Sequence, residues 1–496
     1  MSTPSPVYDS SAFAAALYRA AVEGAAPFPR TRDAVATWCA STPRSTHAGA
    51  PVHVFALGKA ATAMSAGAIE ALVSSGRAIA AVTIVTSHEP QRAELGPMGA
   101  FPPGVRERIA VHVGDHPVPG PASLNAADAI EDAVQQVQEG DDVIVLISGG
   151  ATALAAAPTS ALSLQVGDAG RAQAHIANLA QTLLESGLAI HEMNAIRRRV
   201  LRWGAGRLCV ALHTRGARQI AAFAISDVIG DAPEVIGSGP CSPDPFDDTM
   251  LFALLDAHQL RASLDRDMAL FLGVEGATRP PTVPSPAHAA FEIVSYTYVA
   301  RNRDALIAAA QAARRAGVEQ IQMDDTPLQG EASDLGDEIA RRALHAAATL
   351  PRTERSVWIA GGEPVVHLRS TVERALRADE EDGTPDEPMK GGRMQAFALA
   401  AAMRLEERAR DVDDFAWRIT ILAAGTDGRD GPTDAAGAIV DCGTALDARR
   451  SGRRRPERDL ETGRSWFSLN AANALLRTGP TGTNVMDVVA VIIEPR

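Results

Sequence analysis

The sequence predicts an α/β protein with a parallel sheet covered by helices on both faces, joined to a smaller second α/β domain. Two patterns indicate this class. Short β-rich runs bounded by Gly, Ser or charged residues alternate with helix-length segments, and the alternation restarts after a Pro-rich stretch. The apolar residues are mainly aliphatic, since aromatic residues make up only 4% of the 496 residues, and aliphatic cores suit buried parallel strands.

The first half of the chain contains four β-rich runs. A short tail precedes a helix expected from about Ser11. The expected strands are Val52–Leu57, Ala80–Thr86, Val143–Ile147 and Gln219–Ile225. The expected helices are Ala60–Val73, Ala122–Val137, Arg171–Ser186 and His191–Leu201. Strands that alternate with helices in this way predict parallel pairing.

The second half repeats the alternation after the Pro-rich stretch Thr278–Ala287. The stretch is the best boundary candidate, and it predicts an N-terminal domain over residues 1–285 and a C-terminal domain over 286–496. The expected strands are Glu292–Val299, Val357–Ala360, Trp417–Ala424 and Val488–Glu494. The expected helices are Asn302–Ala316, Glu331–Thr349 and Met394–Glu407.

Two charged segments interrupt this pattern. Ala378–Lys390 is acidic and contains two prolines, and Ala448–Arg464 is strongly basic. No aromatic residues interleave with the arginines of the basic segment, which favours a solvated surface loop over a nucleic-acid patch. We therefore expect Ala448–Arg464 to be mobile, outside both cores and dispensable.

Charge and cysteine usage exclude several classes of protein. The formal net charge is −13 and the pI is near 5.4, which argues against nucleic acid and anionic membranes as partners. The cysteines lie too far apart for a disulfide framework or a zinc site, and reduced thiols are expected at Cys39, Cys209, Cys241 and Cys442. No apolar run approaches the roughly 20 residues that span a bilayer, and no cleavage signal is seen. The expected location is the cytoplasm.

Glycine-rich turns follow three expected strands of the first half. Gly58-Lys59-Ala60 follows the first, Ser148-Gly149-Gly150 follows a second, and Ala224–Pro240 contains Asp227, Asp231 and a Ser238-Gly239 turn. Ligands bind outside the carboxyl ends of strands in open parallel sheets, and helix N-termini there attract phosphate. Paired carboxylates suit Mg²⁺ or a general base. Tight turns and helix caps also use these residue types.

The second half has comparable turns. Glu363 follows two glycines after a strand, and Arg393 follows Gly391-Gly392 before a helix, where an arginine can bind carboxylate or phosphate. The dense Gly and Asp cluster of residues 425–434 exceeds what a turn requires, and a last Gly/Thr loop spans residues 478–484.

Several familiar motifs are absent from the sequence. It has no G-x-x-x-x-G-K-[ST] loop, no protein-kinase motif set, no G-x-S-x-G elbow and no histidine spacing typical of metal sites. No G-x-G-x-x-G/A opens a helix after a strand either, which argues against a dinucleotide cofactor.

The order of these segments resembles the glycerate 2-kinase family with its MOFRL C-terminal domain. The resemblance runs from about Val52 to Asp487. It rests on FALGKAATAM, GDHPVPGPAS, LISGGATAL, ISDVIGDAPEVIGSGP, AGGEPVVHL, GGRMQAFALA, GTDGRDGPTDAAGA and TGPTGTNVMD in family order. It implies ATP- and Mg²⁺-dependent phosphorylation of D-glycerate to 2-phosphoglycerate. It also implies a Rossmann-like N-terminal domain, a smaller MOFRL-type domain and an active site in the cleft between them. Glycerate and nucleotide are then the expected partners, and a homodimer is left open.

The resemblance also implies residue roles. Lys59 matches the family's active-site lysine and Arg393 its arginine from the second domain, while Asp227 and Asp231 match the D-V-x-G-D segment and are the Mg²⁺ candidates. The further residues implied to bind substrate or phosphate are Gly58, Ser148, Gly149, Gly150, Asn194, Arg197, Ser238, Gly239, Glu363, Gly392, Thr426, Asp427, Asp430, Thr481 and Asn484.

The chain departs from the family pattern beside some of these residues. Ala151 and Thr152 replace a Gly-Ser pair, and Met394 and Ala396 occupy positions that are usually polar. These changes keep two alternatives open, a kinase for another small hydroxy acid and a non-catalytic metabolite-binding protein. A third alternative is hydroxypyruvate reductase, a name that relatives of the family carry, but it would require a bound dinucleotide.

Overall fold

The computed structural model describes residues 9–41, 50–89, 101, 103–188, 190–275, 283–350, 354–367, 387–411, 417–452 and 454–495. The chain forms two compact units. We call Pro27–Val299 the parallel-sheet unit, and Ala300–Arg496 together with the N-terminal helix α1 (Ser10–Gly24) the mixed-sheet unit. The α/β class predicted from the sequence is confirmed.

The boundary between the two units does not fall at 285/286, where the sequence led us to expect it. The change of unit falls at Val299/Ala300, and α1 belongs with the C-terminal half of the chain. Ala14, Leu17, Tyr18 and Ala21 form the buried face of α1, which packs against α14 (Asn302–Arg315), β9 (Trp417–Gly425) and β12 (Asp487–Pro495). Residues 276–282 of the Pro-rich region lie outside the described residues.

The parallel-sheet unit is built on six strands in the order β3-β2-β1-β4-β5-β6. The pairs that join β1 to β2, β1 to β4, β2 to β3 and β4 to β5 are all parallel. Both β1 and β4 are buried along their whole length, as expected for strands covered on both faces. The strands are β1 (Val52–Leu57), β2 (Ile79–Thr86), β3 (Ile109–Val113), β4 (Asp142–Ile147), β5 (Gln219–Ile225) and β6 (Val294–Ala300).

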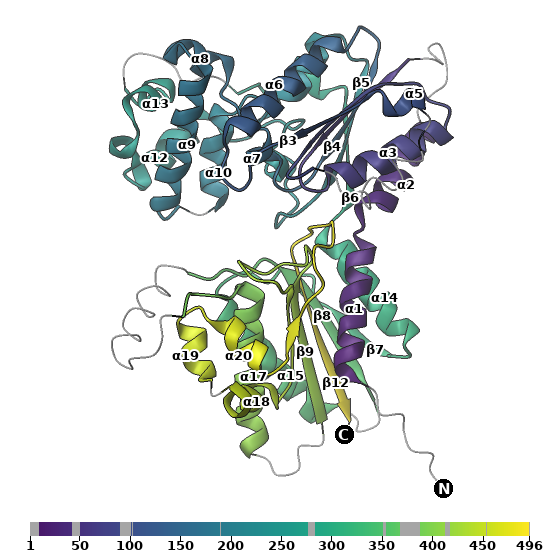
Figure 1. Ribbon diagram of the computed structural model, residues 1–496, viewed down its shortest axis with the longest axis vertical. Helices are drawn as coiled ribbons and strands as arrows, with labels where there is room; N and C mark the ends of the chain where they lie inside the picture. Colours follow the sequence, from purple (N-terminus) through teal and green to yellow (C-terminus); the bar gives the residue numbers. More distant parts are fainter. Residues whose placement is uncertain are drawn as a thin grey trace. The chain divides into compact units, whose positions relative to one another are not determined.

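Helices cover this sheet on both faces (Figure 1). On one face α2 (Pro27–Ser41) and α3 (Ala61–Ser74) pack together against the strands. On the other, α6 (Pro121–Gln136) and α11 (Arg207–Thr214) share a core with Phe55, Leu57 and the strand residues beside them. The shorter elements are α5 (Pro103–Arg106), α7 (Ala151–Leu154), η1 (Ile236–Ser238), η2 (Leu260–Ser263) and η3 (Ala289–Phe291).

A group of helices with its own apolar core extends one side of this unit, at the left in Figure 1. Its residues include Leu162, Ile176, Ile196 and Leu255. The helices are α8 (Ser160–Val166), α9 (Ala169–Glu185), α10 (Ile190–Val200), α12 (Asp248–Ala257) and α13 (Arg266–Phe271).

The strand order creates a topological switch point between β1 and β4. From β1 the chain continues to β2 on one side, whereas from β4 it continues to β5 on the other. Because the following segments diverge there, the carboxyl ends of β1 and β4 border the crevice in which ligands bind in such sheets. Leu57 and Ile147 are the last residues of these two strands and are paired.

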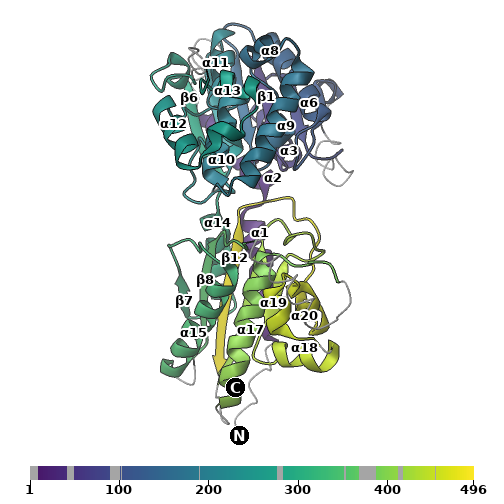
Figure 2. The same ribbon diagram turned by 90° about the vertical axis from the view of Figure 1, so that its left-hand side faces the viewer.

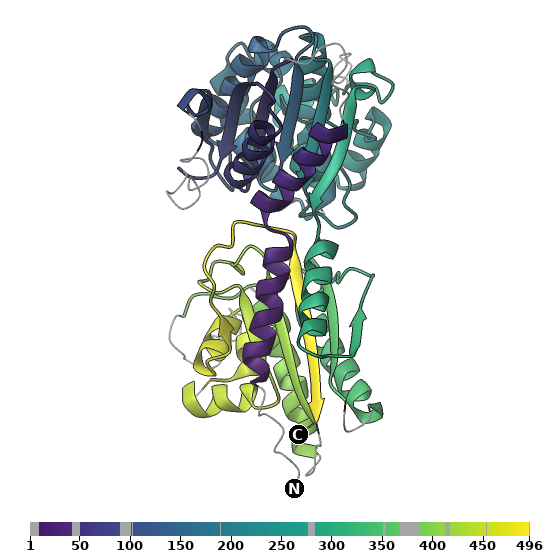
Figure 3. The ribbon, with the colours of Figure 1, turned by 90° about the vertical axis from the view of Figure 1, so that its right-hand side faces the viewer.

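The mixed-sheet unit has the strand order β11-β10-β9-β12-β8-β7. The central strand β12 runs antiparallel to both β8 and β9, whereas β7 pairs with β8 in parallel. Helices α15 (Ala332–Thr349) and α17 (Arg393–Asp411) share the core of one face, while α1 and α14 lie side by side on the other (Figures 2 and 3). The remaining strands are β7 (Gln320–Met323), β8 (Ser356–Gly362), β10 (Gly437–Val440) and β11 (Leu475–Leu476).

The basic segment Ala448–Arg464 is not the mobile loop that its composition suggested. It lies in α18 (Thr444–Gly452), α19 (Pro456–Glu461) and the turns around them, which lead to α20 (Ser465–Ala471). Arg454 pairs with Asp459 at 2.6 Å and with Glu387, a residue of the acidic segment, at 2.9 Å, so ion pairs hold this segment in a packed structure. Of the acidic segment, residues 378–386 lie outside the described part of the chain.

Among the described residues, no helix combines the length and the apolar character that a bilayer span requires.

Candidate active site

The turns that follow β1 and β4 are bonded to each other at the switch point. The backbone N–H of Lys59 donates to the carbonyl of Gly149 at 2.9 Å, and the N–H of Ala60 donates to Ser148 Oγ at 3.1 Å. Gly58 has a φ of +123°, and a Cβ there would lie 2.3 Å from Ser148 Oγ. Ser148 is buried and its hydroxyl joins the two turns, while Lys59 lies two residues before α3 and has an exposed side chain.

The two glycines after β4 bring side chains from three other strand ends to this point. A Cβ on Gly149 would lie 2.0 Å from Asp227 Oδ2, which follows β5. A Cβ on Gly150 would lie 3.2 Å from Lys59 Cγ and 3.3 Å from His116 Cδ2, which follows β3. Asp227, Lys59 and His116 can approach the turn this closely only because it carries no side chains.

The Ser238-Gly239 turn lies beside the Ser148-Gly149-Gly150 turn that follows β4. Gly237, Ser238 and Gly239 all have positive φ values, and a Cβ on Gly237 would lie 2.8 Å from the side chain of Ile147. The hydroxyls of Ser238 and Thr152 are hydrogen-bonded at 2.7 Å. Thr152, one of the departures from the family pattern, therefore ties the two turns together.

Three expected site residues of this unit lie elsewhere or are engaged through their backbone. Asp231 has a φ of +54°, and its carbonyl accepts a 2.5 Å hydrogen bond from Tyr298 on β6. Asn194 and Arg197 lie on α10, half-buried. Burial lowers the pKa of the Arg197 guanidinium. Within the part of the chain that the structure describes, no hydrogen bond or ion pair joins these α10 residues to Lys59 or to the glycine turns.

The mixed-sheet unit contains a cavity of about 690 Å³. Charged residues of both signs line it, together with Gly391 and Gly392. Its charged lining residues are Glu331, Arg393, Asp427, Arg429, Asp430, Glu461 and Asp487. The expected residues Gly392, Arg393, Asp427, Asp430 and Asn484 are thus brought together in one cavity.

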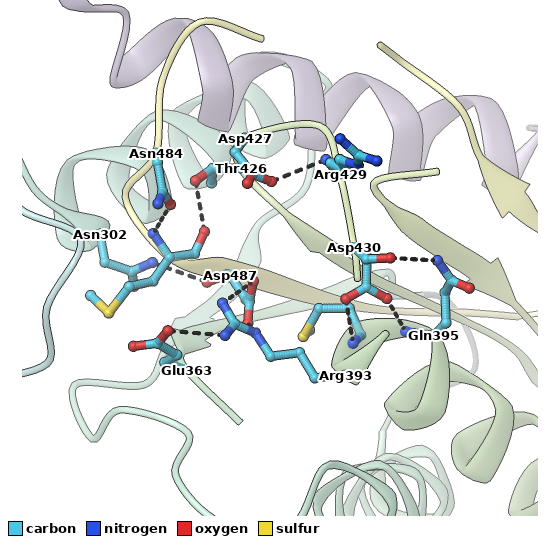
Figure 4. A network of polar contacts seen from close by, with 12 residues as sticks. Asn302, Glu363, Arg393, Gln395, Thr426, Asp427, Arg429, Asp430, Asn484 and Asp487 are labelled. Carbon is cyan, nitrogen blue, oxygen red and sulfur yellow. Dashed lines mark hydrogen bonds and ion pairs between the residues drawn. The ribbon is translucent and has the colours of Figure 1, made fainter. Parts of the chain in front are cut away.

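Arg393 is held in place by two acidic residues (Figure 4). Its Nε donates to Asp487 Oδ2 at 2.7 Å, and its Nη1 donates to Glu363 Oε1 at 2.9 Å. These charges raise the pKa of Arg393 despite the opposing effect of burial. A third of the side chain is exposed, so the guanidinium is oriented by the protein and still faces the cavity.

Asp430 caps α17. Its carboxylate accepts the backbone N–H groups of Met394 and Gln395 at 3.1 and 2.8 Å. Burial raises the pKa of Asp430 to about 7, and the charge of Asp487 adds to this. The backbone N–H groups of Met394 and Gln395 are therefore already bound to a carboxylate of the protein. Asp430 has a structural role as the cap of this helix.

The hydroxyls and amides of the neighbouring loops bind one another. Thr426 is buried, and its Oγ1 donates to the carbonyl of Met486 and accepts from Val485 N–H. Thr481 Oγ1 donates to the carbonyl of Thr426 at 2.6 Å, and Asn484 Oδ1 accepts from Met486 N–H. These residues hold the cavity wall in shape.

Carboxylates are the side chains through which proteins most often bind Mg²⁺. Among the described residues, no three side chains of the His, Cys, Asp or Glu types are placed to share one ion. Kinase sites usually hold Mg²⁺ with one or two carboxylates plus substrate phosphates. Asp227, half-buried against Gly149, is a carboxylate of that kind, so the donor set fits this mode of binding.

His116 and Asp487 were not among the site residues expected from the sequence. His116 belongs to the GDHPVPGPAS segment, which was recognised only as a motif, and Asp487 ends the last motif. The only signals were that His116 lies within one recognised motif and that Asp487 ends another.

Comparison with known proteins now adds to this geometry. Residues 13–273 match DUF4147, a domain of unknown function, and residues 356–487 match the MOFRL family. The chain is 30% identical over 443 residues to the D-glycerate 2-kinase of Thermotoga maritima, covering 89% of this chain and 90% of the relative. The chain belongs to the glycerate 2-kinase family.

Two further likenesses bear on this glycerate 2-kinase family member. A crystal structure of glycerate kinase from Thermotoga maritima superposes with a TM-score of 0.72 and 26% identity, covering 98% of this chain and 99% of that one. An Agrobacterium vitis protein named "Putative hydroxypyruvate reductase" is 33% identical over 390 residues, covering 78% of each chain. Family relatives thus carry both names.

Proposed function

We propose that this protein is an ATP-dependent kinase that phosphorylates the 2-hydroxyl of D-glycerate, giving 2-phosphoglycerate and ADP. The observation that carries the proposal is the group formed at the switch point, where Lys59, the Gly149-Gly150 turn and Asp227 meet at the ends of β1, β4 and β5. The relatives named glycerate kinases support the choice of substrate.

This group suits phosphoryl transfer because that reaction needs positioning and charge neutralisation more than covalent chemistry. Lys59 supplies a cation beside a turn that lets a ligand approach the backbone closely. An anionic substrate needs such a local cation, since the chain as a whole carries a net charge of −13. Asn194, Arg197, Ser238 and Gly239 are proposed as further substrate or phosphate contacts.

Asp227 and Asp231 are proposed to orient or deprotonate the acceptor hydroxyl and to contribute ligands for Mg²⁺. When bound, the ion supplies positive charge to the nucleotide phosphates. Asp227 stands beside the glycine turn, where a carboxylate can fix the direction of a hydroxyl by accepting its hydrogen bond.

In the mixed-sheet unit, Arg393 is proposed to bind an anionic group of substrate or nucleotide. Glu363 and Asp487 orient its guanidinium, and Asp427 and Asn484 line the same cavity. Gly392 leaves room for the Asp430 carboxylate, which a Cβ there would meet at 2.3 Å, while Thr426, Asp430 and Thr481 support the walls. A cleft between the two domains as the place of catalysis stays a prediction.

The reductase alternative has one structural argument in its favour, because the order β3-β2-β1-β4-β5-β6 is that of dinucleotide-binding sheets. The turn after β1 argues against it. It reads Gly58-Lys59-Ala60, with Ala60 where the dinucleotide fingerprint has its second glycine, the one that lets the backbone approach the pyrophosphate.

Phosphorus NMR of the reaction product tests the proposed function. With ATP, Mg²⁺ and D-glycerate we expect a new phosphomonoester signal split into a doublet, because phosphate on C2 couples to a single proton. A triplet would identify phosphate on C3, with its two protons, and would assign the enzyme to the other hydroxyl. No new phosphoester signal would contradict phosphorylation of glycerate.

A further inference from the structure

His116 is held at the switch point by a fixed loop. The loop leaves β3 at Val113 and enters α6 at Pro121. Asp115 Oδ2 accepts the backbone N–H groups of Ala122 and Ser123 at 2.8 and 3.2 Å, and Asp115 N–H donates to Ser123 Oγ at 3.0 Å. Asp115 thus caps α6, and the residue that follows it has a defined position.

The His116 ring lies over the Gly150 turn together with Lys59. The point where a Cβ on Gly150 would stand is 3.3 Å from His116 Cδ2 and 3.3 Å from Lys59 Cε. Gly150 has a φ of +86°, which glycine adopts most easily. The absence of a side chain at Gly150 therefore lets the Lys59 side chain and the His116 imidazole approach the same point.

Neither ring nitrogen of His116 makes a hydrogen bond or ion pair with any residue that the structure describes. Three charged groups surround this place. They are Lys59 from the turn after β1, Asp115 in the loop of His116 itself, and Asp227 beside Gly149 of the glycine turn. Partial burial and the Lys59 charge lower the pKa of His116, so the ring is neutral at pH 7 and one nitrogen is an acceptor.

We propose that His116 accepts the proton of the hydroxyl that receives the phosphoryl group. As the hydroxyl oxygen bonds to the γ-phosphorus, its O–H bond breaks and the proton moves to the imidazole. The bond from the γ-phosphorus to the bridging oxygen breaks, and its electron pair stays on the leaving nucleoside diphosphate. This step rests on the proposed kinase function and leaves Asp227 to orient the hydroxyl and hold the metal.

The pH dependence of kcat/KM for glycerate tests this role, with His116→Gln compared to wild type. In wild type, kcat/KM falls as the pH drops through the pKa of His116, because the protonated ring cannot accept the proton. Gln keeps a hydrogen-bonding group but cannot take a proton. We expect kcat to fall by about 10²–10⁴-fold, the acid limb to disappear and nucleotide affinity to stay within about twofold.

Three comparisons make the test decisive. His345→Gln, an exposed histidine of α15, should keep the wild-type profile. Proton NMR should show the pKa of the His116 ring rising in Lys59→Met, which reports the pairing without turnover. Unchanged melting of His116→Gln and His116→Asn would show that the fold is kept.

Each remaining outcome has a defined meaning. An acid limb that survives in His116→Gln and disappears in Asp227→Asn would overturn the proposal in favour of Asp227, as would a His116→Gln enzyme with nearly normal kcat. If wild type transfers no phosphoryl group to any small hydroxy acid, the proposed function fails and this role fails with it.

Discussion

Lys59 is one of only two lysines in the chain, the other being Lys390. Arginine supplies the remaining basic side chains among 47 Lys and Arg residues, so a lysine at the switch point is a departure from the chain's own usage. An ammonium is a compact point charge with three rotatable donors, whereas guanidinium is a planar fork. The compact Lys59 side chain approaches Gly150 beside His116.

Lys59→Ala should leave the fold intact and remove most turnover. The exposed side chain contributes little to packing, but its charge would meet negative charge that develops in the transition state. Loss of one such contact typically costs about 2.7–4 kcal/mol, or roughly 10²–10³ in kcat. Steady-state kinetics with glycerate and ATP measure the effect.

Lys390→Ala is the matched control, because Lys390 stacks on Trp466 at 3.3 Å from the ring centre and has no proposed role in transfer. It should turn over like wild type. A folded and fully active Lys59→Ala enzyme would remove Lys59 from the active site.

Individual site residues were predictable where their sequence context was distinctive. Gly58, Lys59 and Gly149 could be assigned to one edge because each follows a buried apolar run. His116 could not be assigned to this edge. The strand before it, β3, is short and has no buried residue, so nothing in the sequence indicated a strand there. Asp487 is bonded to Arg393 across 94 positions of sequence, and no local pattern reports such a pairing.

At the scale of elements, buried strands were predicted well. The expected Val52–Leu57 and Gln219–Ile225 have the same bounds as β1 and β5, since a continuous aliphatic run between turns has few alternatives. β7 was missed because Gln320–Met323 alternates exposed polar residues with half-buried ones. β10 and β11, with four and two residues, are too short to produce a pattern.

The segment Ala448–Arg464 shows why charge content alone predicted a loop wrongly. Arg449 and Arg454 have partners that are distant in sequence or lie in the next helix, and the Arg454 guanidinium also lies 4.9 Å from the Phe467 ring centre. Asp459 is 4% exposed and accepts from Ser468 Oγ as well as from Arg454. Opposite charges brought together by folding give this segment a packed structure.

Arg454→Ala should therefore destabilise the mixed-sheet unit. It leaves the buried Asp459 without its cation, which should cost about 3 kcal/mol, at the lower end for a broken buried pair because Arg454 is partly exposed. Urea unfolding followed by tryptophan fluorescence measures the change in free energy. Arg450→Ala, an exposed arginine of α18, should change it by less than about 0.5 kcal/mol. If the two variants are equally stable, the ion pairs of Arg454 do not stabilise the fold, and the segment behaves as a surface loop.

The whole molecule differs from its sequence-based division because one unit is discontinuous. The helix beginning at Ser10 was predicted, but not its partner, since α1 joins a unit whose other residues begin at Ala300. Tyr18 of this helix donates a 2.8 Å hydrogen bond to the carbonyl of Gly425, at the end of β9. The apolar face of a helix shows that the helix packs on something, but it does not show on which sheet. The Pro-rich stretch indicated the position of the domain boundary only approximately.

We expect this molecule to transfer a phosphoryl group and not a hydride. The most direct measurement follows ADP release with ATP, Mg²⁺ and D-glycerate beside NAD(P)H oxidation with hydroxypyruvate, on the same preparation of full-length protein. We predict ADP release that depends on glycerate and no NAD(P)H oxidation above the enzyme-free control. Oxidation of NAD(P)H by hydroxypyruvate without glycerate-dependent ADP release would contradict the account.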